Sequence, residues 1–281
     1  MFATLLKYEF RRTKNILLPL NLGALAIGAV GYFLMLLFTK IIDNPDSDLF
    51  IAAPLLYLLC FGLMLMVGLL GTALAIVLCI QFYRDKFTDQ GYLTFTLPAS
   101  THQILLSSYL NFLIWTVINT IVTFIAVAMM VTPFFTYMFA QFSEMGLDVA
   151  YLWALIKEHI AEILPSGILF TVAYIMIIVS SLFYGITLPY LAITLASVLV
   201  KKLKLLLAVG IGYGMSMILG LVPTALSMIE GIVTGIILVN YDLSFYAPGA
   251  FSLIVTSVIY MAFAIGGYFL MHHLVTKKMN L

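Results

Sequence analysis

Long apolar stretches alternate with short polar segments along this chain, and six of the stretches are long enough to cross a membrane. A membrane-spanning helix needs about 20 consecutive, mostly apolar residues. We expect the spans at residues 16–38, 50–82, 109–132, 166–200, 205–228 and 248–273. At about 1.5 Å per residue the second measures roughly 50 Å, which exceeds the ~30 Å hydrocarbon core. The pattern predicts an all-α integral membrane protein with six transmembrane helices in one domain over residues 1–281.

Three segments outside the spans have patterns of their own. In residues 1–15 apolar and basic positions fall on opposite faces, which predicts an amphipathic elbow helix on the inner leaflet. The same basic residues could instead serve only to orient the chain. Residues 133–165 form an outer segment that starts at Pro133 and contains a second amphipathic helix. Residues 230–248 are apolar but too short to cross, as is typical of a re-entrant or interfacial segment.

The basic residues predict the orientation of these spans. If the N-terminus is cytoplasmic, 11 of the 13 lysines and arginines fall on the inner side. The two exceptions are Lys40 and Lys157. Lysine and arginine concentrate in the short cytoplasmic loops of membrane proteins. We therefore expect a multi-pass protein of the plasma membrane with both termini in the cytoplasm.

Composition narrows the class of protein further. Apolar residues make up 64% of the chain and charged residues 9%, against roughly 25% charged in an ordinary soluble domain. The formal net charge of +1 gives no reason to expect nucleic acid as a partner. His102 and His159 are isolated and fall on opposite sides of the membrane, so we expect no metal site. No Ser/His/Asp set shares one face and depth, and the chain is not expected to be an enzyme.

The inner segment at residues 83–108 combines charged residues with the aromatic residues Phe87, Tyr92 and Phe95. Apolar groups on a water-facing loop often mark a docking surface, although a plain connecting loop is the alternative. Ser100 and Gln103 have the spacing of a capping box, which predicts that a new helix begins there and continues into the third span.

The run Asp-Gln-Gly-Tyr-Leu-Thr-Phe-Thr-Leu-Pro-Ala-Ser at residues 89–100 resembles the signature of type-2 ABC transporter permeases. The matching residues are Asp89, Gly91, Leu93, Leu97, Pro98 and Ser100, whereas Tyr92 replaces the usual threonine. The start of the chain, Leu5 to Arg11, is similar to the N-terminal elbow of such permeases. The layout of six spans, cytoplasmic ends and a short re-entrant segment before the last span extends the resemblance to the whole chain.

The resemblance implies a transport subunit that works with a separate ATPase, which would hold ATP and Mg²⁺. Residues 83–98 would then be the coupling helix that docks on this ATPase, with contact residues Arg84, Asp85, Phe87, Asp89, Gly91, Tyr92, Leu93, Leu97 and Pro98. It also implies a second permease, in a homodimer or heterodimer, in a bacterial plasma membrane. Export of drugs or antimicrobial peptides, and hence drug resistance, is a common theme of the family.

Other features leave alternatives open. The chain has no phosphate-binding G-x-x-x-x-G-K-[ST] motif of its own. Gly210 and Gly214 are four residues apart, a spacing of small residues that lets membrane helices pack closely. Glu230 is either an acid of an outer gate or an interfacial carboxylate that ends the fifth span. Charge-free spans favour hydrophobic or amphipathic cargo such as peptides, drugs or lipids. The competing functions are a non-transporting scaffold or sensor component and an ion-gradient-driven secondary transporter.

Overall fold

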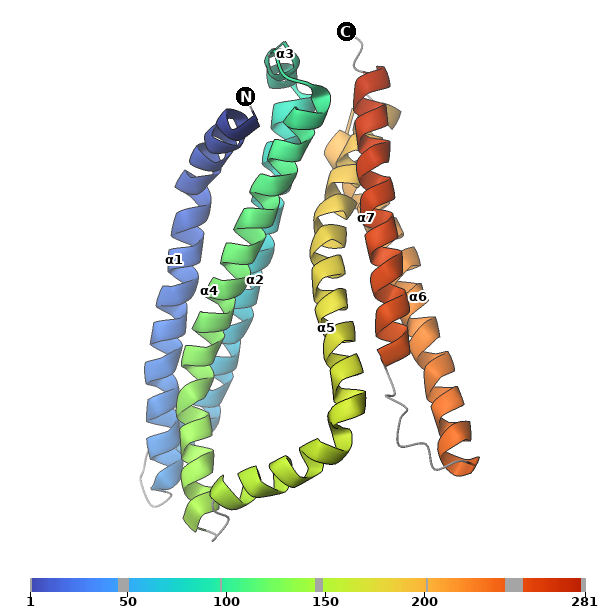
Figure 1. The fold of residues 1–281 in the computed structure, drawn as a ribbon. Coiled ribbons are helices and arrows are strands. Elements are labelled where there is room, and N and C mark those ends of the chain that lie inside the picture. Colours follow the sequence, from blue (N-terminus) through green and yellow to red (C-terminus); the bar gives the residue numbers. More distant parts are fainter. Residues whose placement is uncertain are drawn as a thin grey trace. The chain divides into compact units, whose positions relative to one another are not determined.

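The computed structural model describes residues 2–44, 51–96, 98–144, 149–200, 202–240 and 250–278. Within these ranges the side chains of residues 89, 92, 93, 149, 150, 152, 153, 155–167, 234–240 and 278 are outside the description. The described residues form seven helices in the order α1 (Phe2–Asp43), α2 (Ala53–Phe87), α3 (Asp89–Phe95), α4 (Thr101–Glu144), α5 (Val149–Leu199), α6 (Lys204–Asn240) and α7 (Ala250–Lys278) (Figure 1).

Six of the helices in the described part of the chain are long and apolar enough to cross a membrane, and α3 is the short exception. Many of their large apolar side chains point outward: Leu206, Ile218 and Leu221 in α6 are each about two-thirds exposed or more. Exposing such an apolar surface to water would cost free energy, whereas the hydrocarbon tails of lipids would cover it. The chain is an all-helical, multi-pass membrane protein, and the expected fold class is confirmed at this level.

The ends of several elements differ from the expectation. Helix α1 is continuous from Phe2 to Asp43, and the expected separate elbow helix is not confirmed. Pro133 does not close the third span, because α4 continues through it to Glu144. Helix α6 likewise runs on to Asn240, and the expected re-entrant segment is not confirmed. Residues 241–248 of that segment lie outside the described residues, as do most side chains of the amphipathic stretch expected before residue 165.

Two compact bodies divide the chain. The first comprises Ala3–Leu78 and Leu110–Lys157, and its packing joins α1, α2 and α4. Ala24, Val67 and Ala126 form a buried contact with one residue from each of these helices. Small residues allow the close approach, since a Cβ on Gly28 would lie only 2.8 Å from the Cα of Ala126. A second cluster around Met35, Phe38, Ala53 and Cys60 joins α1 to α2.

The N-terminal part of α1 is held against α4 by a buried polar network. Trp115 Nε1 donates a hydrogen bond to Thr13 Oγ1 at 2.8 Å, and the Trp115 ring stacks on Phe10 at 5.1 Å between ring centroids. Thr13 and Asn111 are hydrogen-bonded at 3.3 Å. Thr13, Asn111 and Trp115 are all buried, so this contact is a fixed part of the body.

The second body comprises Met1–Phe2, Cys79–Tyr109 and Glu158–Leu281. Buried Ala173 in the middle of α5 packs with Ala250 at the start of α7. Further along, a Cβ on Gly267 would lie 2.7 Å from Thr187 Cγ2, which places α7 close against α5 again. Helix α6 packs beside α5 through Gly212, whose Cβ would contact Ala192. Within this body α3 and the C-terminal end of α7 lie at the same end (Figure 1).

Candidate functional site

Helix α3 is folded back on the end of α2. The N–H of Gly91 donates to the carbonyl of Thr88 at 2.7 Å, which closes the turn between the two helices. Thr94 Oγ1 donates to the carbonyl of Asp85 at 3.0 Å, and Thr88 Oγ1 donates to the carbonyl of Arg84. A Cβ on Gly91 would lie 2.6 Å from the carbonyl oxygen of Lys86, so this backbone approach requires glycine.

The predicted coupling residues differ in their exposure. Arg84 and Pro98 are exposed and Phe87 is partly exposed. Asp85 is 7% exposed and Lys86 only 2%, which corrects the expectation that the charges of this segment project into water. The side chains of Asp89, Tyr92, Leu93 and Leu97 lie outside the described residues.

The segment ends where the capping box predicts. Helix α4 begins at Thr101, directly after Ser100. The N–H of Gln103 donates to Ser100 Oγ at 3.3 Å, and the N–H of Ile104 donates to the carbonyl of Ser100 at 3.1 Å. The first bond satisfies a donor that the first turn of a helix leaves without a partner, and the second is the first regular bond of the helix, so the predicted cap is confirmed.

A cluster of aromatic side chains, which we call the inner aromatic cluster, connects the ends of α2 and α4 with α5. The rings of Phe82 and Tyr190 stack at 3.8 Å between centroids and 9° between planes. The hydroxyl of Tyr109 donates to the carbonyl of Phe183 at 3.0 Å and lies 2.9 Å from Thr187 Oγ1. Because packed interiors transmit displacement, a shift of α2 at Phe82 would be passed directly to α5.

The same cluster extends to α7 through a histidine. The hydroxyl of Tyr268 and Nδ1 of His102 are hydrogen-bonded at 2.7 Å, and the His102 and His272 ring centroids are 6.0 Å apart. Tyr268 also meets Tyr109 edge to face at 5.9 Å. The start of α4 is therefore tied to both α5 and α7. Among the described residues no group of three metal-ligating side chains is present.

The structure gives the glycines of α6 different surroundings within the described chain. Nothing lies within 4 Å of a Cβ on Gly210 or Gly214, so these two residues make no close helix contact inside the described chain. Gly212 is the packing residue, with Ala192 at 3.5 Å and Leu188 at 3.7 Å from its Cβ position. Helix packing through Gly210 and Gly214 stays a prediction.

Glu230 links α6 to α7. Its side chain is 6% exposed, and Oε2 accepts a hydrogen bond from the backbone N–H of Ser252 at 3.1 Å. Ser252 lies in the first turn of α7, where backbone N–H groups have no partner within the helix and attract negative charge. Glu230 therefore does not end α6; it caps α7. Nothing in the structure tests the expected role of Glu230 in an outer gate.

Replacing Glu230 should loosen the start of α7. Glu230→Ala removes the acceptor from the Ser252 N–H and should cost about 1.5–3 kcal/mol, whereas Glu230→Gln keeps an acceptor oxygen and should cost less. Amide hydrogen exchange at Ser252 and unfolding in detergent measure the two effects. If Gln is as damaging as Ala, the negative charge rather than the hydrogen bond holds the helix end.

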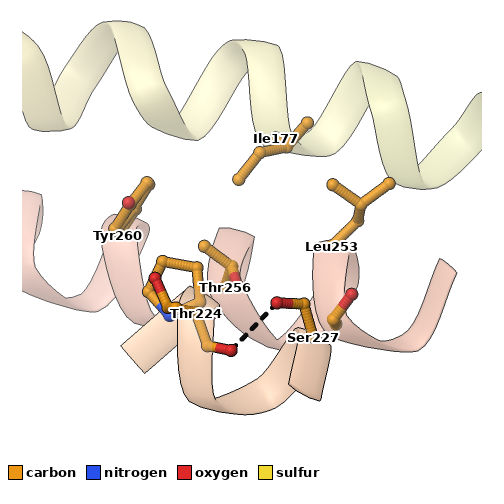
Figure 2. A pocket seen from close by; sticks show the side chains of 8 residues that line it. Ile177, Thr224, Ser227, Leu253, Thr256 and Tyr260 are labelled. Carbon is orange, nitrogen blue, oxygen red and sulfur yellow. Dashed lines mark hydrogen bonds between the residues drawn. The ribbon is translucent and has the colours of Figure 1, made fainter. Parts of the chain in front are cut away.

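A pocket of about 400 Å³ opens between α5, α6 and α7 (Figure 2). Five of its lining side chains carry a hydroxyl group: Thr224, Ser227, Ser252, Thr256 and Tyr260. Ile177, Pro223 and Leu253 supply the apolar part of the lining. A mainly apolar pocket of this size that also carries hydroxyl groups, within a membrane-spanning body, is a candidate binding site.

Sequence reasoning missed the inner aromatic cluster, the pocket and Gln81. The aromatic residues Tyr109, Tyr190 and Tyr268 lie near predicted span ends, where tyrosine is common in any membrane protein. Gln81 gave a clearer signal, because it is a lone amide at the end of an apolar stretch. The structure buries Gln81 to 6% exposure, and among the described residues neither of its amide atoms has a hydrogen-bond partner.

Comparison with known proteins gives no relative from which a family or function follows: no family model, curated protein or solved structure matches the chain.

Proposed function

We propose that the chain is the membrane-spanning permease subunit of an ATP-driven ABC exporter, in which a separate ATPase subunit binds ATP and Mg²⁺. The observation that carries the proposal is α3, a helix of seven residues between two membrane-spanning helices. It coincides with the stretch whose sequence resembles the permease signature. A short helix that is fixed to the end of a long helix is a suitable docking element for a partner protein that must move the long helix.

The packing around α3 supports a mechanical role. Gly91 and Thr94 hold α3 against the last residues of α2, so a push on α3 would displace that end of α2. Phe82 would pass the displacement to Tyr190 in α5 through their stacked rings. Rigid-body movement of packed helices is a common way to convert a local change into a distant one. ATP-driven closure of the ATPase would supply the push.

The exposed apolar surface and the composition favour a hydrophobic or amphipathic cargo, such as a peptide, drug or lipid. In this proposal a second permease, identical or related, completes the transport path in a bacterial plasma membrane. Both chain termini and α3 would face the cytoplasm, as the distribution of basic residues favours. Export of drugs or antimicrobial peptides would confer resistance.

Affinity purification of the chain from its host in mild detergent tests the proposal. We expect a stoichiometric ATPase subunit to copurify and the complex to hydrolyse ATP in the presence of Mg²⁺. Mass spectrometry identifies the partner, and an unrelated six-span protein from the same membrane serves as control. Purification without an ATPase would contradict the proposal and favour a scaffold component or an ion-gradient-driven carrier.

A further inference from the structure

The beginning of α1 carries a row of basic side chains on one exposed face. Lys7, Arg11 and Lys14 are exposed, and their spacing of four and three residues places them along one side of the helix. Like charges at these spacings repel each other. Glu9 lies two residues from both Lys7 and Arg11, and residues two apart do not face each other on a helix. Within the described part of the chain no hydrogen bond or ion pair occupies the three basic side chains, so the row can bind an anion.

The direction of the basic row is fixed because the opposite face of α1 is packed. Thr13 is buried and accepts a hydrogen bond from Trp115, and Phe10 stacks on the same tryptophan ring. At about 3.6 residues per turn Thr13 lies almost opposite Arg11. These contacts hold this part of α1 against α4, so the basic side chains face outward from the first body.

An apolar surface continues the basic row along the same helix. Leu18 and Leu22 lie four and eight residues beyond Lys14 and are exposed as well. Half of the ~30 Å hydrocarbon core is about 15 Å, which corresponds to roughly ten residues of helix at ~1.5 Å per residue. Residues 18–28 of the continuous helix α1 are therefore long enough to run beside one acyl chain while the basic row stays at the headgroups. Exposed Tyr8 beside the row marks the same level, because tyrosine is enriched at the membrane–water boundary.

We propose that the exposed face of α1 from Lys7 to Leu22 binds a phospholipid whose headgroup has a net negative charge. The three basic side chains donate hydrogen bonds to the oxygens of the headgroup and attract its charge. Leu18 and Leu22 contact an acyl chain. A zwitterionic headgroup fits less well, because its own cation meets the basic row. The inference goes beyond the proposed transport function, since it concerns the chain alone and does not depend on an ATPase partner.

Energy transfer from Trp115 tests the proposal, because this tryptophan lies against Phe10 and Thr13 at the level of the basic row. Trp153→Phe leaves Trp115 as the one tryptophan of the chain. The purified chain is placed in phosphatidylcholine nanodiscs with traces of a lipid that has pyrene on one acyl chain. We expect a phosphatidylglycerol probe to have an association constant roughly tenfold or more above that of a phosphatidylcholine probe, since each basic residue near the surface contributes about a fivefold gain.

Arg11→Gln should lower this preference about fivefold, and Arg11→Lys should keep most of it because the charge is retained. Lys277→Gln is the matched control, because Lys277 is exposed in α7 and its replacement removes the same charge. It should leave the preference unchanged. The preference is a ratio of the two probes within one variant, so a change in tryptophan emission between variants cancels.

Inorganic phosphate should not displace the phosphatidylglycerol probe beyond the effect of chloride at equal ionic strength, because it lacks the acyl chain that Leu18 and Leu22 contact. Specific displacement by phosphate would overturn the proposal in favour of a simple anion site. Equal association of the two probes would overturn it too, and the basic residues would then serve only to orient the chain. Equal losses in Arg11→Gln and Lys277→Gln would show attraction by the whole charged surface and no site on α1.

Discussion

Gly28→Ala is expected to destabilise the packing of α1 against α4 by about 1–3 kcal/mol, the usual cost of forcing atoms into a filled core. The new Cβ would lie 2.8 Å from the Cα and 2.9 Å from the Cβ of Ala126. Neither contact can be relieved by rotating a side chain, since both involve atoms fixed to the α4 backbone. The helices would have to separate, and the buried contact of Ala24, Val67 and Ala126 would open with them.

Gly23→Ala is the matched control on the same helix. No atom of the described residues lies within 4 Å of a Cβ at Gly23, so the substitution adds no clash with them. It should instead stabilise α1 by up to about 1 kcal/mol, because alanine has the higher helix propensity. The two changes are chemically identical and are expected to have opposite signs.

The thiol of Cys60 reports the outcome, because Cys60 is 2% exposed in the cluster that joins α1 to α2. Its rate of labelling by a maleimide, in a chain with Cys79 replaced by alanine, measures opening of the first body. We expect faster labelling for Gly28→Ala and equal or slower labelling for Gly23→Ala. Similar rates for both variants would show that α1 and α4 do not approach each other at Gly28.

The sequence was sufficient to predict the six spans, because uncharged apolar runs of 20 residues or more are typical of membrane-spanning helices. It was not sufficient to predict where the helices end. Pro133 is a helix breaker in water, but in a membrane the chain gains little by leaving the helix, since exposed backbone groups find no water there. Helix α4 continues through Pro133 to Glu144, and α6 continues past Glu230 to Asn240.

Features of the candidate site that depend on residues close together in the sequence could be predicted. The cap at Ser100 depends on residues within four positions and is confirmed by hydrogen bonds. The burial of Asp85 and Lys86 was not predictable, because it accompanies the folding of α3 back onto α2. Charged residues in a polar segment are normally solvated, and no periodicity indicates that a later glycine will bring the chain back over them.

Glu230 and the pocket could not be predicted either, because the residues that interact there lie far apart in the sequence. Glu230 was conspicuous as a carboxylate in an apolar tract, but its partner Ser252 lies 22 positions later, and no pattern connects the two. The hydroxyl groups of the pocket are also scattered over two helices, and single serines and threonines are common in membrane spans. Only the structure brings them together in one pocket.

Gly91→Ala is expected to displace α3 and to reduce copurification of the ATPase by roughly tenfold or more. The added Cβ would lie 2.6 Å from the carbonyl oxygen of Lys86 and 2.8 Å from its carbonyl carbon, both fixed in the last turn of α2. Relief requires α3 to move away, which would break the hydrogen bond from Thr94 to Asp85. A cost of about 1.4 kcal/mol is enough for a tenfold change in an equilibrium, and overpacking reaches that range.

Gly185→Ala is the control in the same body, because nothing lies within 4 Å of its Cβ position in α5. Amide hydrogen exchange of residues 90–95 measures the displacement of α3 independently of any partner, and the amount of ATPase recovered per chain measures docking. We expect Gly91→Ala to raise exchange in α3 and to lose the ATPase, while thermal unfolding of the spans stays unchanged. Raised exchange with full recovery of the ATPase would show that α3 is not the docking element, and unchanged exchange would show that α3 does not pack on Lys86.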